Sequence, residues 1–180
     1  MRVNMQNKTD MIIFGGGCFW CTEAIFKMLR GVVAVIPGYA GGNIKNPTYD
    51  QVCTGNTGHA EVIKIEYDPT QISLQVLLDV FFDAHDPTLL NRQGNDVGTQ
   101  YRSIILYTNK QQLGIISDYI NRLQIQSSKK IVTQVAELGN FYEAEDYHIN
   151  YYQNHSSEQY CTFVITPKIK KIRMKYSKLV

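Results

Sequence analysis

The sequence is poor in the features that mark several common classes of protein. Its four cysteines are too few for a disulfide-built scaffold of 180 residues. No apolar run is long enough to span a bilayer, and residues 1–14 lack the apolar core and cleavage site of a secretory signal. A net charge of +2 indicates neither a nucleic-acid nor a membrane partner. We therefore expect a cytoplasmic globular protein.

The order of the expected elements predicts the fold class. Strands are expected at residues 11–14, 32–36, 61–67, 101–107 and 131–138, and helices at 21–29, 73–85 and 110–123. Because they interleave without a regular βαβ repeat, an α+β fold with helices packed on a mixed sheet is expected. No linker or repeat divides the chain, which predicts one domain over residues 1–180. Its core runs from about 11 to about 168, and a solvated basic tail follows.

Three polar segments are expected to lie outside the regular elements. Residues 39–58 and 86–99 are rich in glycine and polar residues and are predicted to be loops. Loops of that length inside a compact domain are usually functional. Residues 142–152 are expected to form a polar, aromatic helix or an irregular segment.

The stretch "GGGCFWC" at residues 15–21 carries two of the four cysteines. Cys18 follows a glycine-rich turn and begins an expected helix, where backbone N–H groups and the helix dipole favour an anion. A thiol at that point is expected to be biased toward the thiolate. Phe19 and Trp20, the single tryptophan, are either core residues or the wall of a pocket for a small apolar group, since sulfur and methyl groups pack well on aromatic rings.

Two other functions compete for the C-x-x-C spacing of Cys18 and Cys21. A dithiol oxidoreductase of the thioredoxin type uses such a pair between a strand and a helix, although usually with smaller residues inside it. A structural zinc site needs a second ligand pair, and Cys53 and His59 do not form one. A buried structural cysteine is the third alternative, and no role is assigned to Cys53.

Several polar residues are candidates to assist a reactive thiol. Glu61 stands at the start of an expected strand and would hold a proton near neutral pH if it were buried beside Cys18. Tyr49, in the first long loop, and Tyr101, at an expected strand start, carry phenols that can donate hydrogen bonds. Asp96 lies in the second loop. The histidines, His59, His85, His148 and His155, lack paired metal-ligand spacing and are interpreted as structural.

These residues lie in sequence blocks that resemble the A-type peptide-methionine sulfoxide reductases. The blocks are "GGCFWC" (16–21), "GYAGG" (38–42), "PTYDQVCTGNTGHAEV" (47–62), "FFDAHDPT" (81–88), "NRQGNDVGTQYRS" (91–103) and "FYEAEDYHINYY" (141–152). They run in the family's order and cover the chain from about residue 14 to about 168. The resemblance implies a two-layer α/β sandwich with a ferredoxin-like core, and reduction of methionine S-sulfoxide, free or in oxidatively damaged proteins.

The resemblance also implies a role for each candidate. Cys18 would be the nucleophile, and Phe19 and Trp20 would receive the substrate methyl group. Tyr49, Glu61 and Tyr101 would polarise and protonate the sulfoxide oxygen, while Asp96 would belong to the same polar network.

A second thiol would then convert the Cys18 sulfenic acid to a disulfide. Cys161 in "EQYCTF" is the preferred resolving residue, with Cys21 as the alternative, because a helical first turn would hold Cys21 away from the sulfenic sulfur. Thioredoxin would be the external reductant. No metal or bound organic cofactor is expected, and the protein is expected to be a monomer.

Overall fold

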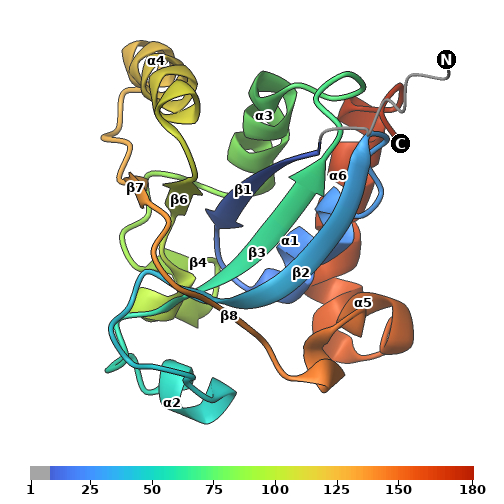
Figure 1. Ribbon diagram of the computed structural model, residues 1–180. Helices are drawn as coiled ribbons and strands as arrows, with labels where there is room; N and C mark the ends of the chain where they lie inside the picture. Colours follow the sequence, from blue (N-terminus) through green and yellow to red (C-terminus); the bar gives the residue numbers. More distant parts are fainter. Residues whose placement is uncertain (1–8) are drawn as a thin grey trace, which may run out of the picture.

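The computed structural model describes residues 9–180, within which six strands form one mixed sheet (Figure 1). The expectation of no secretory signal falls partly on residues 1–8, outside the described residues. The strands are β1 (Asp10–Gly15), β2 (Val32–Ala40), β3 (Ala60–Tyr67), β6 (Ile104–Tyr107), β7 (Gln134–Glu137) and β8 (Phe141–Glu143). Their order is β7-β6-β1-β3-β2-β8, and β6 and β7 pair in parallel while the other neighbours are antiparallel.

The helices lie mainly on one face of this sheet. They are α1 (Phe19–Phe26), α2 (Tyr49–Cys53), α3 (Leu74–Ala84), α4 (Lys110–Gln126), α5 (Tyr151–Asn154) and α6 (Thr166–Lys175). Figure 1 shows α1, α3 and α6 behind the central strands, with α4 beside β6 and β7. Shorter elements are the hairpin of β4 (Arg92–Gln93) and β5 (Asp96–Val97), 3-10 turns at Thr99–Tyr101 and Asp146–His148, and a π-helical turn at Cys161–Ile165.

Alternation along the strands divides the core between the two faces of the sheet. Ile12 and Phe14 of β1 face the helices and join the main core with residues of α1, α3 and α6. Ile13, between them, joins a smaller cluster on the opposite face with Ile104 and Leu106 of β6. Since successive strand side chains point to opposite faces, one strand serves both clusters.

The central strands and their two crossover helices have the ferredoxin-like arrangement. In chain order the elements are β1, α1, β2, β3, α3 and β6, and the strands lie in the order β6-β1-β3-β2. This is a βαββαβ unit with an antiparallel sheet. The predicted α+β class is therefore confirmed.

Three local expectations were wrong. Strand β2 continues through Pro37 and Gly38 to Ala40, because β8 pairs along its end so closely that a Cβ at Gly38 would lie 2.4 Å from the Tyr142 carbonyl oxygen. The expected loop 39–58 contains α2, which begins with a capping box between Thr48 and Gln51. Tyr101 ends a 3-10 turn and does not begin a strand.

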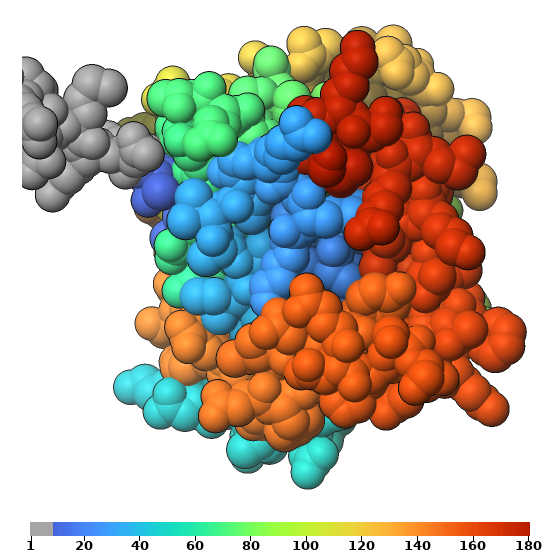
Figure 2. Space-filling model, turned by 90° about the vertical axis from the view of Figure 1, so that its right-hand side faces the viewer, coloured from blue at the N-terminus to red at the C-terminus, as the bar shows by residue number. Residues whose placement is uncertain are grey.

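The C-terminal segment also differs from its prediction. The sequence placed a solvated basic tail after residue 168, whereas α6 continues to Lys175 and buries Ile169 and Ile172 in the main core. Its lysines and arginine alternate with this apolar face, as in an amphipathic helix. Figure 2 shows the orange and red C-terminal residues bordering the blue surface of α1.

Candidate active site

The turn between β1 and α1 places the first cysteine. Gly17 has φ +91°, and a Cβ there would lie 2.8 Å from the Cβ of Gln93, so this position favours glycine. Cys18 is the residue before α1, with extended backbone angles (φ −58°, ψ 127°). The Cys21 N–H donates to the Cys18 carbonyl at 3.1 Å, which closes the first helical turn. Both thiols therefore lie on one side of the helix start.

The two thiols are in hydrogen-bond contact with each other. Burial and the interaction with Cys21 raise the pKa of Cys18 well above its usual value. The hydrogen bond from Cys18, helped by the Lys168 charge, lowers the pKa of Cys21 despite its burial. The first thiolate of the pair therefore forms on Cys21. This direction is opposite to the bias toward the thiolate that the helix start predicts for Cys18, and burial is its largest cause.

Glu61 lies beside this turn, on the central strand β3. Its side chain is 2% exposed, and its Oε2 accepts the Phe19 N–H at 3.0 Å. Burial, with smaller contributions from the charges of Asp96 and Cys21, raises the pKa of Glu61 to about 8 against the lowering effect of the hydrogen bond from Phe19. The carboxyl group is therefore protonated at neutral pH, one residue from the Cys18 thiol.

Three tyrosines lie around Glu61 and the cysteine pair. Burial and the Glu61 charge raise the pKa values of Tyr49 and Tyr101, so both remain proton donors at neutral pH. Tyr160 is in contact with both Cys18 and Cys21, and its hydroxyl donates to Asp96 Oδ2 at 2.8 Å. Glu61, Asp96, Tyr101 and Tyr160 therefore interact electrostatically with the cysteine pair, whereas Tyr49 interacts with Glu61 and Tyr101 and its hydroxyl with Cys53.

An aromatic wall lies next to the thiols. The Trp20 indole stacks on Tyr151, with 3.6 Å between ring centroids and 5° between planes. The rings of Phe19, Tyr49 and His148 pack against one another, with centroids 6.5 Å apart for Phe19 and Tyr49, 4.9 Å for Phe19 and His148, and 4.5 Å for Tyr49 and His148. Such a surface suits a methyl or thioether group.

His148 orients this wall and was missed when the histidines were interpreted only as structural. The Trp20 indole N–H donates to His148 Nδ1 at 3.0 Å. Because an indole can only donate, the imidazole proton must be on Nε2. That buried nitrogen lacks a hydrogen-bond partner among the described residues and lies 3.8 Å from Glu145 Oε2. Glu145 in turn accepts the Tyr49 backbone N–H at 2.8 Å.

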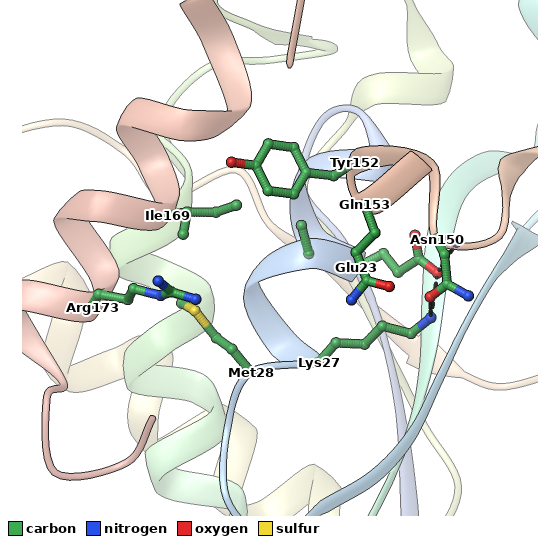
Figure 3. A pocket seen from close by; sticks show the side chains of 9 residues that line it. Glu23, Lys27, Met28, Asn150, Tyr152, Gln153, Ile169 and Arg173 are labelled. Atoms are coloured by element: carbon green, nitrogen blue, oxygen red, sulfur yellow. Dashed lines mark hydrogen bonds and ion pairs between the residues drawn. The ribbon is translucent and has the colours of Figure 1, made fainter. Parts of the chain in front are cut away.

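A buried ion pair holds the wall against α1. Glu23 accepts from Lys27 at 2.8 Å and from the Asn150 backbone N–H at 2.9 Å. Figure 3 shows the Lys27 ammonium directed at both Glu23 and Asn150. Asn150 has φ +58° and precedes α5, which carries Tyr151. The ion pair therefore fixes the start of the helix on which Trp20 stacks.

These residues border a pocket of about 210 Å³ between α1, α5 and α6 (Figure 3). Its lining includes Met28, Gln153 and Arg173 but none of the predicted site residues. The pocket is therefore separate from the cysteine pair.

The two remaining cysteines occupy different environments. Cys161 is buried in the π-helical turn directly after Tyr160, and the Cys21 charge contributes to raising its pKa, after burial and Glu158. Cys53 is exposed at the end of α2, where its thiol meets the Tyr49 hydroxyl. All four thiols are free.

The described part of the chain offers neither a metal site nor a membrane-spanning helix. Residues 9–180 contain no group of three or more histidine, cysteine, aspartate or glutamate side chains that could hold a metal ion. None of the helices formed by these residues has the length and apolar character needed to cross a membrane.

Sequence comparison identifies relatives over most of the chain. The model of the family described as peptide methionine sulfoxide reductase matches residues 10–179. Peptide methionine sulfoxide reductase MsrA of Saccharolobus solfataricus is 54% identical over 162 residues, which are 90% of this chain and 92% of that protein.

Solved structures agree with this match. Mxr1 from Saccharomyces cerevisiae in its reduced form superposes with a TM-score of 0.82 and 35% identity, covering 87% of this chain and 91% of that one. Mxr1 in complex with Trx2 superposes with a TM-score of 0.58 and 26% identity, covering 81% of this chain and 86% of that one.

Proposed function

Because the chain belongs to the peptide methionine sulfoxide reductase family, and so is a reductase of methionine sulfoxide, we propose that it acts on the S-epimer with Cys18 as nucleophile. The observation that supports this assignment best is the protonated, buried Glu61 carboxyl group held to the backbone next to Cys18. A neutral acid beside a thiol fits a reaction that must protonate an oxygen while sulfur attacks sulfur.

The first half-reaction is a two-electron exchange between two sulfur atoms. The Cys18 sulfur attacks the sulfoxide sulfur and forms a bond to it, while the proton of the Cys18 thiol passes to the sulfoxide oxygen. Glu61 donates a second proton to this oxygen, which leaves as water as its bond to the substrate sulfur breaks, and the Tyr49 and Tyr101 hydroxyls stabilise the charge that develops on it. Water then adds to the Cys18 sulfur, the bond between the two sulfur atoms breaks to release methionine, and the proton that is freed returns to Glu61. Overall, thiol and sulfoxide give methionine and a Cys18 sulfenic acid, so the thiol is oxidised and the sulfoxide reduced.

The second half-reaction needs another thiol, for which we propose Cys21. The two thiols are close enough to shift each other's pKa, and Cys18 stands before the first helical turn with non-helical backbone angles. These observations support Cys21, whereas the preference for Cys161 depended on a helical first turn that would hold Cys21 away from the sulfenic sulfur. Cys161 stays the alternative, buried after Tyr160 on the same side of the site.

An assay with each epimer of a methionine sulfoxide peptide tests the function. We expect turnover of the S-epimer, less than one hundredth of that rate with the R-epimer, and no turnover by Cys18→Ser. Equal rates on both epimers, or activity in the Cys18→Ser variant, would contradict the mechanism. Reduction of an unrelated protein disulfide at a comparable rate would favour the dithiol oxidoreductase.

Mass mapping after one turnover without reductant tests the resolving residue. We expect a Cys18–Cys21 disulfide in the unmodified protein and in Cys161→Ser. In Cys21→Ser we expect a trapped sulfenic acid that reacts with dimedone. A Cys18–Cys161 bond as the sole product would instead assign that role to Cys161.

The reductant, location and assembly are part of the proposal. Mxr1 has been solved in complex with Trx2, which supports a thioredoxin as the reductant that reopens the disulfide here. Four free thiols fit a reducing compartment such as the cytoplasm. We propose that the protein acts as a monomer without a bound cofactor, on methionine sulfoxide either free or within proteins.

A further inference from the structure

Lys168 lies against the thiol that we propose as the resolving residue. Its ammonium donates to Cys21 Sγ across 3.9 Å, although 147 positions separate the two residues in the sequence. Lys168 is carried by the first turn of α6, after Pro167, and its side chain is half-buried. Helix α6, which begins where the sequence predicts the core to end, therefore brings a positive charge to the cysteine pair.

Among the described groups that act on Cys21, Lys168 is the one that carries a positive charge. Asp96 is negative and disfavours a second anion, whereas Tyr160 and Cys18 supply neutral hydrogen-bond donors. Two more acids act on the same cluster: Glu61, which is protonated at neutral pH, and Cys161, whose thiol keeps its proton because burial raises its pKa. A thiolate on Cys21 is therefore balanced mainly by the Lys168 ammonium and by hydrogen bonds.

Two other lysines of α6 have Asp83 as their partner. Lys171 donates to the Asp83 carbonyl oxygen at 2.8 Å, and Lys175, at the far end of α6, forms an ion pair with the Asp83 carboxylate at 2.5 Å. Lys168 borders a groove of about 670 Å³ whose lining includes Gln93, Asp96 and Tyr160. Its ammonium thus stands between solvent in the groove and a buried sulfur atom.

We propose that Lys168 is a positioning residue for the second half-reaction, in which it stabilises the Cys21 thiolate that attacks the Cys18 sulfenic acid. In this step an S–S bond forms, the S–O bond of the sulfenic acid breaks, and the oxygen leaves as water after gaining a proton. Cys21 is oxidised and the sulfenic sulfur reduced, so no further reagent is needed. The inference rests on the proposed function and on Cys21 as the resolving thiol.

The positive charge of Lys168 affects disulfide formation more than it affects methionine release. Methionine is released before Cys21 attacks, so loss of Lys168 leaves the first half-reaction nearly unchanged. A pKa increase of about one unit would cut the thiolate fraction about tenfold near neutral pH. Because a more basic thiolate is also a better nucleophile, the net slowing is about three- to tenfold.

A single-turnover experiment on the full chain separates the two steps. Reduced protein is mixed with one equivalent of the S-sulfoxide, without reductant, between pH 6 and pH 9.5. Methionine release is followed by rapid quench, and disulfide formation by thiol titration and by the fluorescence of Trp20, which adjoins Cys21. Lys168→Met keeps most of the aliphatic stem, Lys168→Arg restores the charge, and Lys170→Met, on the exposed side of α6, is the matched control.

We expect Lys168→Met to release methionine at the normal rate and to form the disulfide three- to tenfold more slowly at pH 7. Its disulfide-step pH profile should move to higher pH, so that the difference disappears near pH 9.5, and Lys168→Arg should recover most of the rate. An unshifted profile in Lys168→Met, equal slowing in Lys170→Met, or a rapidly formed Cys18–Cys161 bond would overturn the inference. Absence of methionine release from the unmodified protein would instead refute the proposed function.

Discussion

At the scale of single residues, the protonation of Glu61 has the largest consequence for activity. The carboxyl group has a pKa of about 8 and must carry its proton to serve the sulfoxide oxygen. We therefore expect methionine release to be constant at neutral pH and to fall about tenfold per unit well above pH 8. Glu61→Gln should slow methionine release about a hundredfold or more, because its amide is a far weaker acid.

The matched measurement is alkylation of Cys18 by iodoacetamide in the same variant. If Glu61 acts as proton donor, Glu61→Gln changes the alkylation rate less than threefold. A comparable loss in alkylation and in methionine release would mean that Glu61 tunes the thiol, and the acid role would have to be abandoned.

The same group predicts how stability depends on pH. In the folded chain Glu61 holds its proton up to about pH 8, whereas in the unfolded chain it releases it at its ordinary pKa. This group's stabilising effect is therefore complete below the unfolded pKa and is lost as pH rises to about 8. Glu61→Gln should raise the melting temperature at pH 8 and leave it almost unchanged at pH 4. A lower melting temperature for Glu61→Gln than for the unmodified protein at pH 8 would contradict this prediction.

Sequence reasoning found the candidate residues that stand in the blocks shared with the reductase family, which are Cys18, Tyr49, Glu61, Asp96 and Tyr101. Glu61 could be named as a candidate, but its burial depends on β3 being a central strand, which its own sequence does not determine. Tyr160, His148 and Lys168 have no spacing relation to Cys18 and reach it only through the packing of the C-terminal segment on α1. Their roles could not be predicted from local patterns.

At the scale of elements, the ion pair that joins α1 to α5 should control substrate binding. Glu23→Ala removes the acceptor for the Asn150 N–H and the carboxylate that pairs with the partly buried Lys27 ammonium. We expect the free energy of unfolding to fall by about 1–3 kcal/mol. Because Tyr151 then loses its fixed position against Trp20, KM for the sulfoxide should rise severalfold while kcat changes less.

Gln153→Ala is the control for this prediction, since Gln153 is exposed at the edge of the same pocket. It should alter stability by no more than about 0.5 kcal/mol and leave KM unchanged. Stability and steady-state kinetics are measured on both variants. An unchanged KM in Glu23→Ala would show that Trp20 and Tyr151 keep their stacking without the ion pair.

Elements with strong periodicity were predicted well, and short ones were not. The helix with Ser73 as its cap begins at Leu74, and the alternating strand expected at 61–67 runs from Ala60 to Tyr67. Helix α2 has only five residues, too few for a periodic pattern, so its capping box was the one local signal. The end of β2 was missed because Pro37 and Gly38 usually mark turns, whereas here the close approach of β8 selects the glycine.

At the scale of the whole molecule, the C-terminal segment completes both the core and the site. Leu179 and Val180 accept hydrogen bonds from Arg30 at the other end of α1, and α6 packs on α1 and α3. The lysine-rich composition of this segment suggested solvent exposure, because the two buried isoleucines are too sparse to mark an amphipathic helix. Its docking depends on long-range packing that only the assembled fold supplies.

Substitution of a buried isoleucine in α6 tests whether this helix belongs to the cooperative core. Ile172 is fully buried, so Ile172→Ala should lower the free energy of unfolding by about 2–4 kcal/mol, measured by urea denaturation. Lys170→Ala, on the exposed side, should change it by less than about 0.5 kcal/mol. Equal effects of the two substitutions would mean that α6 detaches before the core unfolds.

Thiol labelling distinguishes these outcomes, because Cys53 is exposed whereas Cys18, Cys21 and Cys161 are buried in different parts of the structure. In the unmodified protein Cys53 should react at once and Cys18 should react in the folded state as the nucleophile, whereas Cys21 and Cys161 should wait for an opening event. Local release of α6 in Ile172→Ala would expose Cys161 and Cys21 while circular dichroism still shows a folded sheet. If the helix is an integral part of the core, as its buried isoleucines require, Cys21 and Cys161 instead become reactive together, at the urea concentration where the sheet unfolds.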